Sequence, residues 1–546
     1  MNTKQGMMVC TWCGWEPLQY YRRLGGFHEA QEGNALWADD WRAKLDSEDC
    51  AKALAKAGVN WVTTHFYKGF GLESEAEEIA ATEKMITNYH RHGVRVFTYI
   101  QYGTIMPETM LAEEPRAAQW GRVDWKGEHD GHPYEYGPQY WRAKPCANQP
   151  GFRDYLLRCV DKAVEIGTDG IWIDNLNADG CHCEFCQDAF KKHLEKSISD
   201  PFRELGLQDL QRVRIPRSER PKERTFQEWV RFRCDETRES LRLMCERARK
   251  IKPGIVTAVN IGVCNHQRAL IENGNWFSNL KDLVDYTYAE NGLFPSWDGK
   301  TITSQQYSMH MANALGISIV PGASNCGGRM PSSTRLRRAF AESAMFGNHA
   351  FGGPWGLRGE DGGGTPELMR DSDFTRFNRT LTDWYGEHAS LYASTTEAAP
   401  VGIYYSFESM IGDETSYRQS LESMMLLLQQ EQIPYRVVFS DRLELEKGLR
   451  LLILPHVKAL SGEQAEKIRI FIKNGGRLLA TGRTGLYDEH MRQRCDYILA
   501  DVYGHSFTPE LEGASRSAGI LNPGNRCLHL PGDWGLAHCR ETQLPA

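Results

Sequence analysis

Two acidic residues stand where apolar, strand-like segments of this chain end. Asp174 closes the segment Gly-Ile-Trp-Ile-Asp that begins at residue 170, and Glu290 follows the segment Tyr-Thr-Tyr-Ala that begins at residue 286. Hydrolysis of a glycoside needs one group that protonates the leaving oxygen and a second that attacks or stabilises the anomeric carbon. Two carboxylates beside one sugar supply both groups, so Asp174 and Glu290 are the expected catalytic pair.

Three cysteines follow Asp174 within one short loop, in the pattern Cys-x-Cys-x-x-Cys: Cys181, Cys183 and Cys186. Structural zinc is held by four ligands in a tetrahedron, and thiolates are common among them. Cys146 precedes the helical segment that leads to the Asp174 strand and is the expected fourth ligand, with His182 as the weaker option. We predict a structural zinc ion that fixes the loop beside Asp174. A group of packed free thiols is the simpler alternative.

Polar and aromatic side chains stand at the ends of other strand-like segments. Aromatic rings can stack on sugar faces, and a few placed polar groups fix a ligand's orientation. The residues that we expect to hold a sugar are Trp12, His65, Tyr67, Lys68, Tyr102, Asn175, Asn260, Arg329 and Trp355. His129 and His132 could bind a metal or a substrate, although histidines in loops more often do neither.

These side chains need a scaffold that brings strand ends together. Eight apolar runs alternate with helical patterns between residue 7 and about residue 393, and this alternation predicts a parallel sheet closed into a (β/α)8 TIM barrel of the α/β class. The expected strands are 8–14, 60–67, 94–103, 170–175, 255–262, 285–290, 317–323 and 349–354. The expected helices are 47–57, 74–91, 151–166, 226–250, 305–315 and 333–346. Active-site groups of such barrels gather at the carboxyl ends of the strands.

The rest of the chain predicts further units. We expect the barrel over residues 1–395 and a small doubly wound α/β domain over 396–504, without a glycine-rich nucleotide loop. The tail 505–546 is rich in glycine and proline and is expected to form a small or incomplete β element. Two long insertions, 107–150 and 200–225, are candidates for the rim of the active site, and a plain solvated insertion is equally consistent with the second.

Composition narrows the classes of partner and compartment. The 546 residues carry a net charge of −7, with 41% hydrophobic and 25% charged residues, which predicts a packed soluble protein without a nucleic-acid partner. No apolar stretch has the length of a signal peptide or a membrane span. We therefore expect a cytoplasmic protein whose 15 cysteines are reduced thiols.

The segment around the cysteines resembles a known family. Asp174-Asn175, followed by Cys-His-Cys-Glu-Phe-Cys-Gln-Asp-Ala-Phe over 181–190, is similar to the Cys-x-Cys-x-x-Cys-x-x-x-Phe zinc segment of the family 42 β-galactosidases. Residues 400–504 look like their trimerisation domain, which is related to glutamine amidotransferases but lacks the active cysteine. The order of the two parts is the same, so the resemblance spans most of the chain. It implies a carbohydrate substrate, zinc and a homo-oligomer, namely a trimer.

One motif departs from family 42. There the motif on the fourth strand ends Asn-Glu and its Glu is the acid/base, whereas Leu176 follows Asn175 in this chain. The sequence is closer to the family called hypothetical glycosyl hydrolase 6, whose fourth strand ends on Asp before the cysteines. An Asp on strand four with an acid on strand six also resembles α-galactosidase, α-glucosidase and α-fucosidase barrels. That likeness implies Asp174 as nucleophile, Glu290 as acid/base, and an α-linked or deoxy sugar.

The expected function is therefore that of a retaining glycoside hydrolase. Two other classes stay open on the sequence. One is a zinc-dependent hydrolase that acts through metal-bound water, which needs an open coordination position. The other is a non-catalytic carbohydrate-binding barrel, which is favoured if Asp174 and Glu290 do not share a pocket.

Overall fold

The computed structural model describes residues 7–14, 36–134, 137–261, 267–289, 296–297, 302–321, 333–347, 349–352, 372–392, 398–443, 448–507, 518–522, 526–530 and 540–543. The chain forms two compact units. Unit 1 comprises 1–193, 231–299 and 303–395, and unit 2 comprises 194–230, 300–302 and 396–546. Each unit is described by itself.

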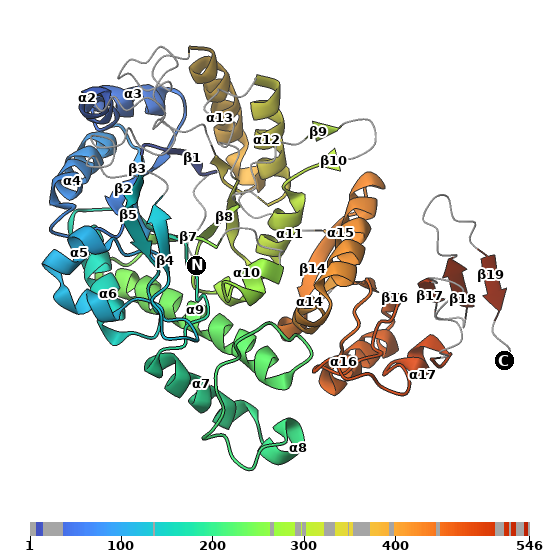
Figure 1. Cartoon of the computed structure of the whole chain (residues 1–546). Helices are drawn as coiled ribbons and strands as arrows, with labels where there is room; N and C mark the ends of the chain where they lie inside the picture. The colour runs from blue at the N-terminus through green and yellow to red at the C-terminus, as the bar shows by residue number, and fades with distance from the viewer. Residues whose placement is uncertain are drawn as a thin grey trace. The chain divides into compact units, whose positions relative to one another are not determined.

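Unit 1 is built on an eight-stranded parallel sheet in the order β11-β8-β7-β6-β3-β2-β1-β12 (Figure 1). The strands are β1 (Val9–Trp12), β2 (Trp61–Tyr67), β3 (Arg95–Gln101), β6 (Gly170–Asp174), β7 (Val256–Asn260), β8 (Tyr286–Ala289), β11 (Ser318–Pro321) and β12 (Phe351–Gly352). The two ends of the sheet meet where the amide of Ala350 donates to the carbonyl of Ile319 at 2.9 Å. The predicted TIM barrel and its eight strands are confirmed.

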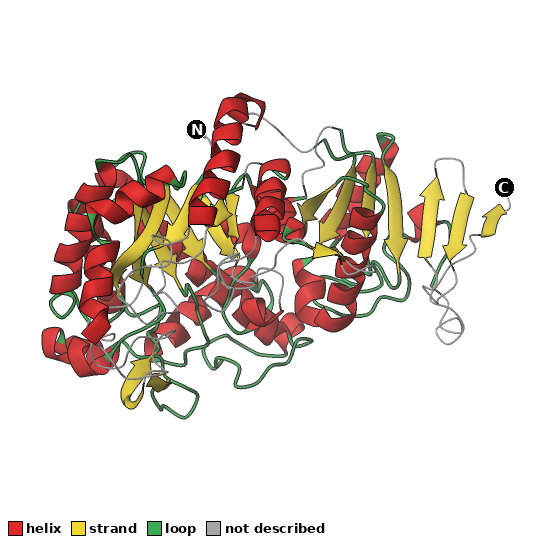
Figure 2. Ribbon diagram, turned by 90° about the horizontal axis from the view of Figure 1, so that it is seen from above, coloured by secondary structure: helices red, strands yellow, loops and turns green. Residues whose placement is uncertain are grey.

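Helices surround the strands of unit 1 (Figure 2). The predicted helices are present as α3 (Glu48–Lys56), α4 (Ala76–His90), α6 (Pro150–Glu165), α9 (Arg224–Ile251), α11 (Gln306–Leu315) and α12 (Ser333–Met345), and α2 (Leu36–Leu45), α7 (Glu184–Ser197) and α13 (Ser372–Tyr392) are additional. Ser47 caps α3 by accepting a hydrogen bond from the amide of Cys50 at 3.2 Å, which satisfies a donor that the helix leaves unpaired.

Aromatic side chains fill the interior of the barrel. Successive strand residues point to opposite faces, so every second residue of each strand faces inward. Trp12, Phe97, Tyr99, Trp172 and Tyr288 belong to one buried cluster that also includes small residues from β7, β11 and the start of β12. The ring of Trp12 packs edge-on against that of Trp172, with centroids 4.9 Å apart. The barrel is thus a packed core up to the level just below Asp174.

The insertion after β3 forms a small antiparallel unit. It contains α5 (Pro107–Glu113), β4 (Gly131–Tyr134) and β5 (Gly137–Ala143), and β4 pairs with β5. The amide of Ala143 donates to the carbonyl of Ile105 at 2.9 Å, and the amide of Cys146 donates to the carbonyl of Trp120 at 2.8 Å. These bonds attach the insertion to the carboxyl end of β3 and fix the position of Cys146.

Unit 2 contains a seven-stranded sheet in the order β14-β13-β15-β16-β17-β18-β19. The first four strands are parallel: β13 (Val401–Tyr405), β14 (Tyr435–Phe439), β15 (Leu451–Leu454) and β16 (Arg477–Thr481). They alternate with α15 (Glu414–Gln430) and α16 (Gly462–Lys473), and Ser461 and Gln464 form a capping box at the start of α16. The tail adds three antiparallel strands, β17 (Ala518–Asn522), β18 (Arg526–Leu530) and β19 (Arg540–Gln543).

The charged insertion between β6 and β7 belongs to unit 2. The side-chain amide of Gln227 donates to the carbonyl of His490 at 3.1 Å, and Arg492 donates to the carbonyl of Glu204 at 3.4 Å. We expected 200–225 to form either the rim of the active site or a plain solvated insertion. This packing corresponds to neither.

Among the helices of the described ranges, none has both the length and the apolar character needed to cross a membrane.

Candidate active site and cysteine cluster

Asp174 is held at the carboxyl end of β6 by three hydrogen-bond donors. The hydroxyl of Tyr99 donates to Oδ2 at 2.5 Å, the side-chain amide of Asn175 donates to the same oxygen at 2.6 Å, and that of Asn260 donates to Oδ1 at 2.9 Å. The carboxylate is nearly buried, with 7% of the residue exposed. Donors from β3, from the residue after β6 and from the end of β7 therefore fix its orientation in the barrel mouth.

Tyr99 connects Asp174 to a buried cation. The ammonium of Lys68 donates to the Tyr99 hydroxyl at 3.2 Å and lies 4.9 Å from the centroid of the Tyr99 ring. The Tyr99 hydroxyl also contacts the side-chain oxygen of Gln101. Gln101 in turn donates to Thr104 at 3.0 Å. The network therefore extends from Asp174 to the ends of β2 and β3.

The backbone turns sharply after Asp174. Asn175 has φ +51°, in the left-handed region that Asn tolerates better than most residues, so β6 ends at Asp174. The turn brings the Asn175 carbonyl against Gly103, where an added Cβ would lie only 2.6 Å from that oxygen. Only glycine accommodates this close approach without movement of the Asn175–Leu176 peptide.

An aromatic floor lies below the carboxylate. Trp12, with 8% of its surface exposed, packs edge-on against Trp172, Tyr99 and Tyr288 at 4.9, 6.2 and 6.1 Å between centroids. Such pairs contribute about 0.5–1.5 kcal/mol each beyond area burial. Trp12 thus forms part of a rigid base beneath the Asp174 network.

Three further predicted sugar-binding residues point elsewhere. His65 is fully buried, and its Nε2 lies 2.9 Å from the carboxylate of Glu75. Tyr67 packs against Tyr155 of α6 because the register shifts by one residue between His65 and Tyr67 and turns the side chain to the helix layer. Tyr102 follows the end of β3 and donates to Ser240 of α9 at 3.0 Å. The structure therefore places Lys68, Asn175, Asn260 and Trp12 around Asp174, and not these three.

The remaining predicted site residues, Glu290, Arg329 and Trp355, lie outside the described residues, and so does the side chain of His132.

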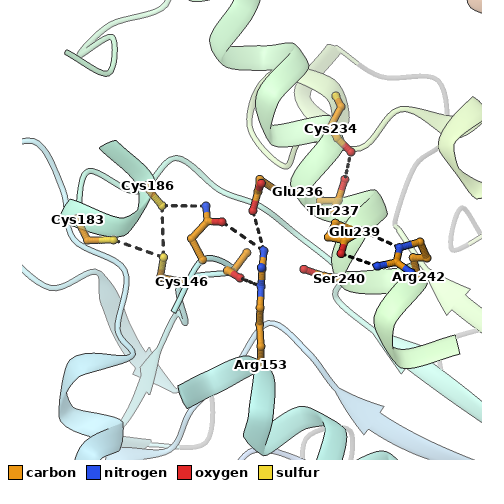
Figure 3. Close-up of polar contacts among 12 residues, drawn as sticks. Cys146, Arg153, Cys183, Cys186, Cys234, Glu236, Thr237, Glu239, Ser240 and Arg242 are labelled. Carbon is orange, nitrogen blue, oxygen red and sulfur yellow. Dashed lines mark hydrogen bonds and ion pairs between the residues drawn. The ribbon is translucent and has the colours of Figure 1, made fainter. Parts of the chain in front are cut away.

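The four predicted metal ligands come together. The sulfur atoms of Cys146, Cys181, Cys183 and Cys186 all lie within 4.8 Å of one another. Cys146 Sγ is 3.6 Å from that of Cys183 and 3.4 Å from that of Cys186 (Figure 3). A tetrahedral zinc site with Zn–S bonds of about 2.3 Å has its sulfur atoms about 3.8 Å apart. The donor set and its spacing fit a four-coordinate metal ion. Four thiolates would fill the tetrahedral coordination of a structural zinc ion, and no His or carboxylate of the described residues joins the cluster.

Polar groups support the cysteine cluster from outside. The amide of Val123 donates to Cys181 Sγ at 3.4 Å, and the side chain of Asn148 donates to Cys186 Sγ at 3.3 Å. The guanidinium of Arg153 on α6 donates to the side-chain oxygen of Asn148 at 3.3 Å. Hydrogen bonds from Cys146 lower the pKa of Cys183 and also that of Cys181. Amide donors to sulfur are the arrangement that orients and stabilises thiolate ligands.

Tyr99 and Glu75 were not among the predicted site residues. The prediction took the last residues of each strand, whereas Tyr99 lies two residues inside β3. Because side chains alternate along a strand, the placement of Gln101 at the mouth also puts Tyr99 on the inner face. This alternation was the available signal for Tyr99. No comparable pattern marks Glu75, which precedes α4 in a loop.

The fold has well-characterised counterparts. A catalytic mutant of a GH42 β-galactosidase from G. stearothermophilus superposes with a TM-score of 0.67 at 17% identity, covering 97% of this chain and 80% of that one. A β-galactosidase from Bacillus circulans sp. alkalophilus gives 0.69 at 15% identity, covering 99% and 80%. An α-L-fucosidase isoenzyme 2 from Paenibacillus thiaminolyticus gives 0.57 at 16% identity, covering 98% and 74%.

No family model matches the sequence, and no curated protein matches it. The fold and site thus define a (β/α)8 barrel with a buried, hydrogen-bonded carboxylate at its mouth. In its fold the chain is similar to GH42 β-galactosidases.

Proposed function

We propose that this protein is a retaining glycoside hydrolase in which Asp174 attacks the anomeric carbon. The observation that carries the proposal is the orientation of the Asp174 carboxylate by Tyr99, Asn175 and Asn260 at the mouth of the barrel. The fold of GH42 β-galactosidases and of an α-L-fucosidase supports the reaction class. The substrate would be a carbohydrate.

The hydrogen bonds distinguish the two oxygens of Asp174. A carboxylate oxygen has two lone pairs in its plane, and Oδ2 already accepts from Tyr99 and Asn175. Among the described residues, Oδ1 accepts from Asn260 alone, so one of its lone pairs stays available to a substrate. We assign Oδ1 as the attacking atom and Oδ2 as the atom that anchors the carboxylate.

Glu290 is our proposed acid/base. It directly follows Ala289, the last residue of β8, and is two residues beyond Tyr288 of the inner cluster. In the first step it would protonate the leaving oxygen. In the second step it would take a proton from the attacking water, as a retaining mechanism requires.

The cysteine cluster would have a structural role. We propose that Cys146, Cys181, Cys183 and Cys186 hold zinc, which supplies cross-linking and no reaction step. All four ligands come from protein, as in closed structural sites. The ion would tie the insertion after β3 to the loop that follows Asp174.

The decisive experiment is a panel of aryl α- and β-glycosides tested with the wild type, Asp174→Asn and Glu290→Gln. We expect the wild type to cleave one class of sugar. The activity of both variants should be lower by at least about 1,000-fold, with their melting temperatures retained. Asp161→Asn is the matched control, because its carboxylate pairs with Arg247 on α9 at 2.6 Å, outside the Asp174 network. This control should keep wild-type activity.

A second measurement tests the role of Asp174 itself. In Asp174→Gly, added azide should restore cleavage of an activated glycoside and yield a glycosyl azide of inverted configuration, because azide replaces the missing nucleophile. If Asp174→Asn keeps the activity of the wild type, the assignment is wrong. If no glycoside is cleaved by the wild type, the reaction class is wrong.

A further inference from the structure

We propose that Tyr99, with Lys68 acting through it, is a positioning residue that governs the second half of this reaction, the breakdown of the glycosyl-enzyme. The inference rests on the proposed function and concerns the same site. It arises from the position of the Tyr99 hydroxyl, which lies between Asp174 Oδ2, the side-chain oxygen of Gln101 and the ammonium of Lys68.

The Tyr99 hydroxyl has one proton and at least two acceptors in reach. It contacts the carboxylate of Asp174 at 2.5 Å and the neutral amide oxygen of Gln101. A hydrogen bond to an ionised acceptor is stronger than one to a neutral acceptor. The proton therefore points to Asp174 while this carboxylate is charged, and turns to Gln101 when Asp174 becomes a neutral ester.

Lys68 strengthens the preference of the Tyr99 hydroxyl for the charged form of Asp174. Its ammonium donates to the Tyr99 oxygen at 3.2 Å, and the residue is 6% exposed. A donor to the phenol oxygen polarises its O–H group, so the bond from Tyr99 to Asp174 gains strength. Lys68 therefore stabilises negative charge on Asp174 without contact with it in the described structure.

The backbone of Lys68 is held by Glu75, which is fully buried. The Glu75 carboxylate accepts the amide of Lys68 at 2.7 Å and that of Phe70 at 2.8 Å. His65 of β2 lies 2.9 Å from the same carboxylate and pairs in register with Tyr99 on β3. Thus both ends of the Lys68–Tyr99 contact are attached to adjacent strands.

The charge on Asp174 changes in opposite directions in the two steps. In the first, Oδ1 bonds to the anomeric carbon, the bond to the leaving oxygen breaks, and that oxygen takes a proton from Glu290. In the second, water bonds to the anomeric carbon, Glu290 takes the water proton, and the electron pair of the Oδ1–carbon bond returns to Asp174. Donors to Asp174 therefore assist the second step, in which negative charge reappears.

The test uses the full chain and a dinitrophenyl glycoside of the sugar found in the panel. With this leaving group the first step is fast, so breakdown of the intermediate limits kcat. For Tyr99→Phe we expect kcat and KM to fall together, each about 10- to 100-fold, with kcat/KM within about threefold of wild type. A burst of about one equivalent of dinitrophenolate should precede the steady state.

Two further variants separate this role from a structural one. Lys68→Met should change kcat and KM in the same direction by a smaller factor, and Lys68→Arg should restore most of the loss. Tyr89→Phe is the matched control, because it removes a buried hydroxyl that donates to the carbonyl of Leu45 at 2.6 Å in the helix layer. It should leave both constants unchanged.

The inference is overturned if Tyr99→Phe lowers kcat/KM as much as kcat and shows no burst, while Asp174→Asn is inactive. In that case Asp174 remains the nucleophile and Tyr99 has no special part in the second step. If Asp174→Asn is as active as the wild type, the proposed function itself fails and this inference fails with it.

Discussion

Replacement of Gly103 by alanine should impair activity through the backbone next to Asp174. The added Cβ would lie 2.6 Å from the carbonyl oxygen of Asn175 and 3.2 Å from the Cβ of Asn175. Ordinary C···O contacts are about 3.3 Å or longer, so the Asn175 carbonyl must move by about 0.7 Å. Because Asn175 already has φ +51°, the backbone has little freedom to absorb this shift locally.

The displaced peptide, which joins Asn175 to Leu176, is one residue from Asp174, whose own carbonyl accepts the amide of Tyr102 at 2.9 Å. A 1 Å misplacement of a reacting group costs about 100-fold in rate, so a shift of about 0.7 Å should cost roughly 10- to 30-fold in kcat. Overpacking of this kind also costs about 1–3 kcal/mol of stability, which lowers the melting temperature by several degrees.

The assay is steady-state hydrolysis of the cleaved aryl glycoside, with the melting temperature and metal content measured on the same samples. Gly386→Ala is the matched control, because Gly386 lies in α13 and a Cβ there meets no atom within 4 Å. Full activity of Gly103→Ala, within about twofold of wild type, would refute the argument that the close approach of Gly103 and Asn175 sets the position of Asp174.

Three other perturbations have defined outcomes. Cys186→Ser should bind less than about a tenth of the zinc that the wild type binds and should melt at a lower temperature. Cys495→Ser, at an exposed position, should change neither the zinc content nor the melting temperature. Full zinc content in Cys186→Ser would exclude the cysteine cluster as the zinc site. Burial raises the pKa of Glu342 from 4.5 to about 7, so the folded state binds its proton more tightly than the unfolded chain. The resulting stabilisation, at most about 3 kcal/mol, is complete below pH 4.5 and is lost as the pH rises through 7. Urea denaturation at pH 5 and pH 8 should show a larger loss of stability in the wild type than in Glu342→Gln, which keeps the contribution of Glu75, whose pKa burial raises to about 8; equal losses would contradict the prediction. Asn260→Ala removes the donor to Asp174 Oδ1 at 2.9 Å and should lower kcat about 10- to 100-fold, and an unchanged kcat would argue against a role of this donor at the attacking oxygen.

Hydrophobic alternation was sufficient to predict the barrel. The eight strands are short buried runs separated by helical patterns, and their identity depends on little else than period and spacing. The same pattern placed Asp174 and Asn260 at strand ends, where the structure joins them by a hydrogen bond. Cys146 was predicted as the fourth ligand from its position before α6, and the structure brings its sulfur within reach of the other three.

Side-chain direction beyond a strand's last regular residue was not predictable in this way. Tyr67 faces α6 because of a register irregularity that cannot be recognised from the residue types. Tyr102 lies beyond the end of β3 and contacts a helix instead. His65 has the expected inner position by alternation, but its ring Nε2 contacts the carboxylate of Glu75, which lies in a loop, at 2.9 Å. These outcomes depend on contacts between segments that are distant in the sequence.

The segment 194–230 has a consequence for how the chain emerges from the ribosome. Gln227 bonds to a residue 263 positions later, so at a synthesis rate of about 5–20 residues per second its partner appears roughly 13–50 s after it. During this interval Leu210, Val213 and Ile215, which are buried in the finished protein, have no unit 2 to pack against. The nascent chain therefore carries an apolar segment whose packing partners in unit 2 are synthesised later.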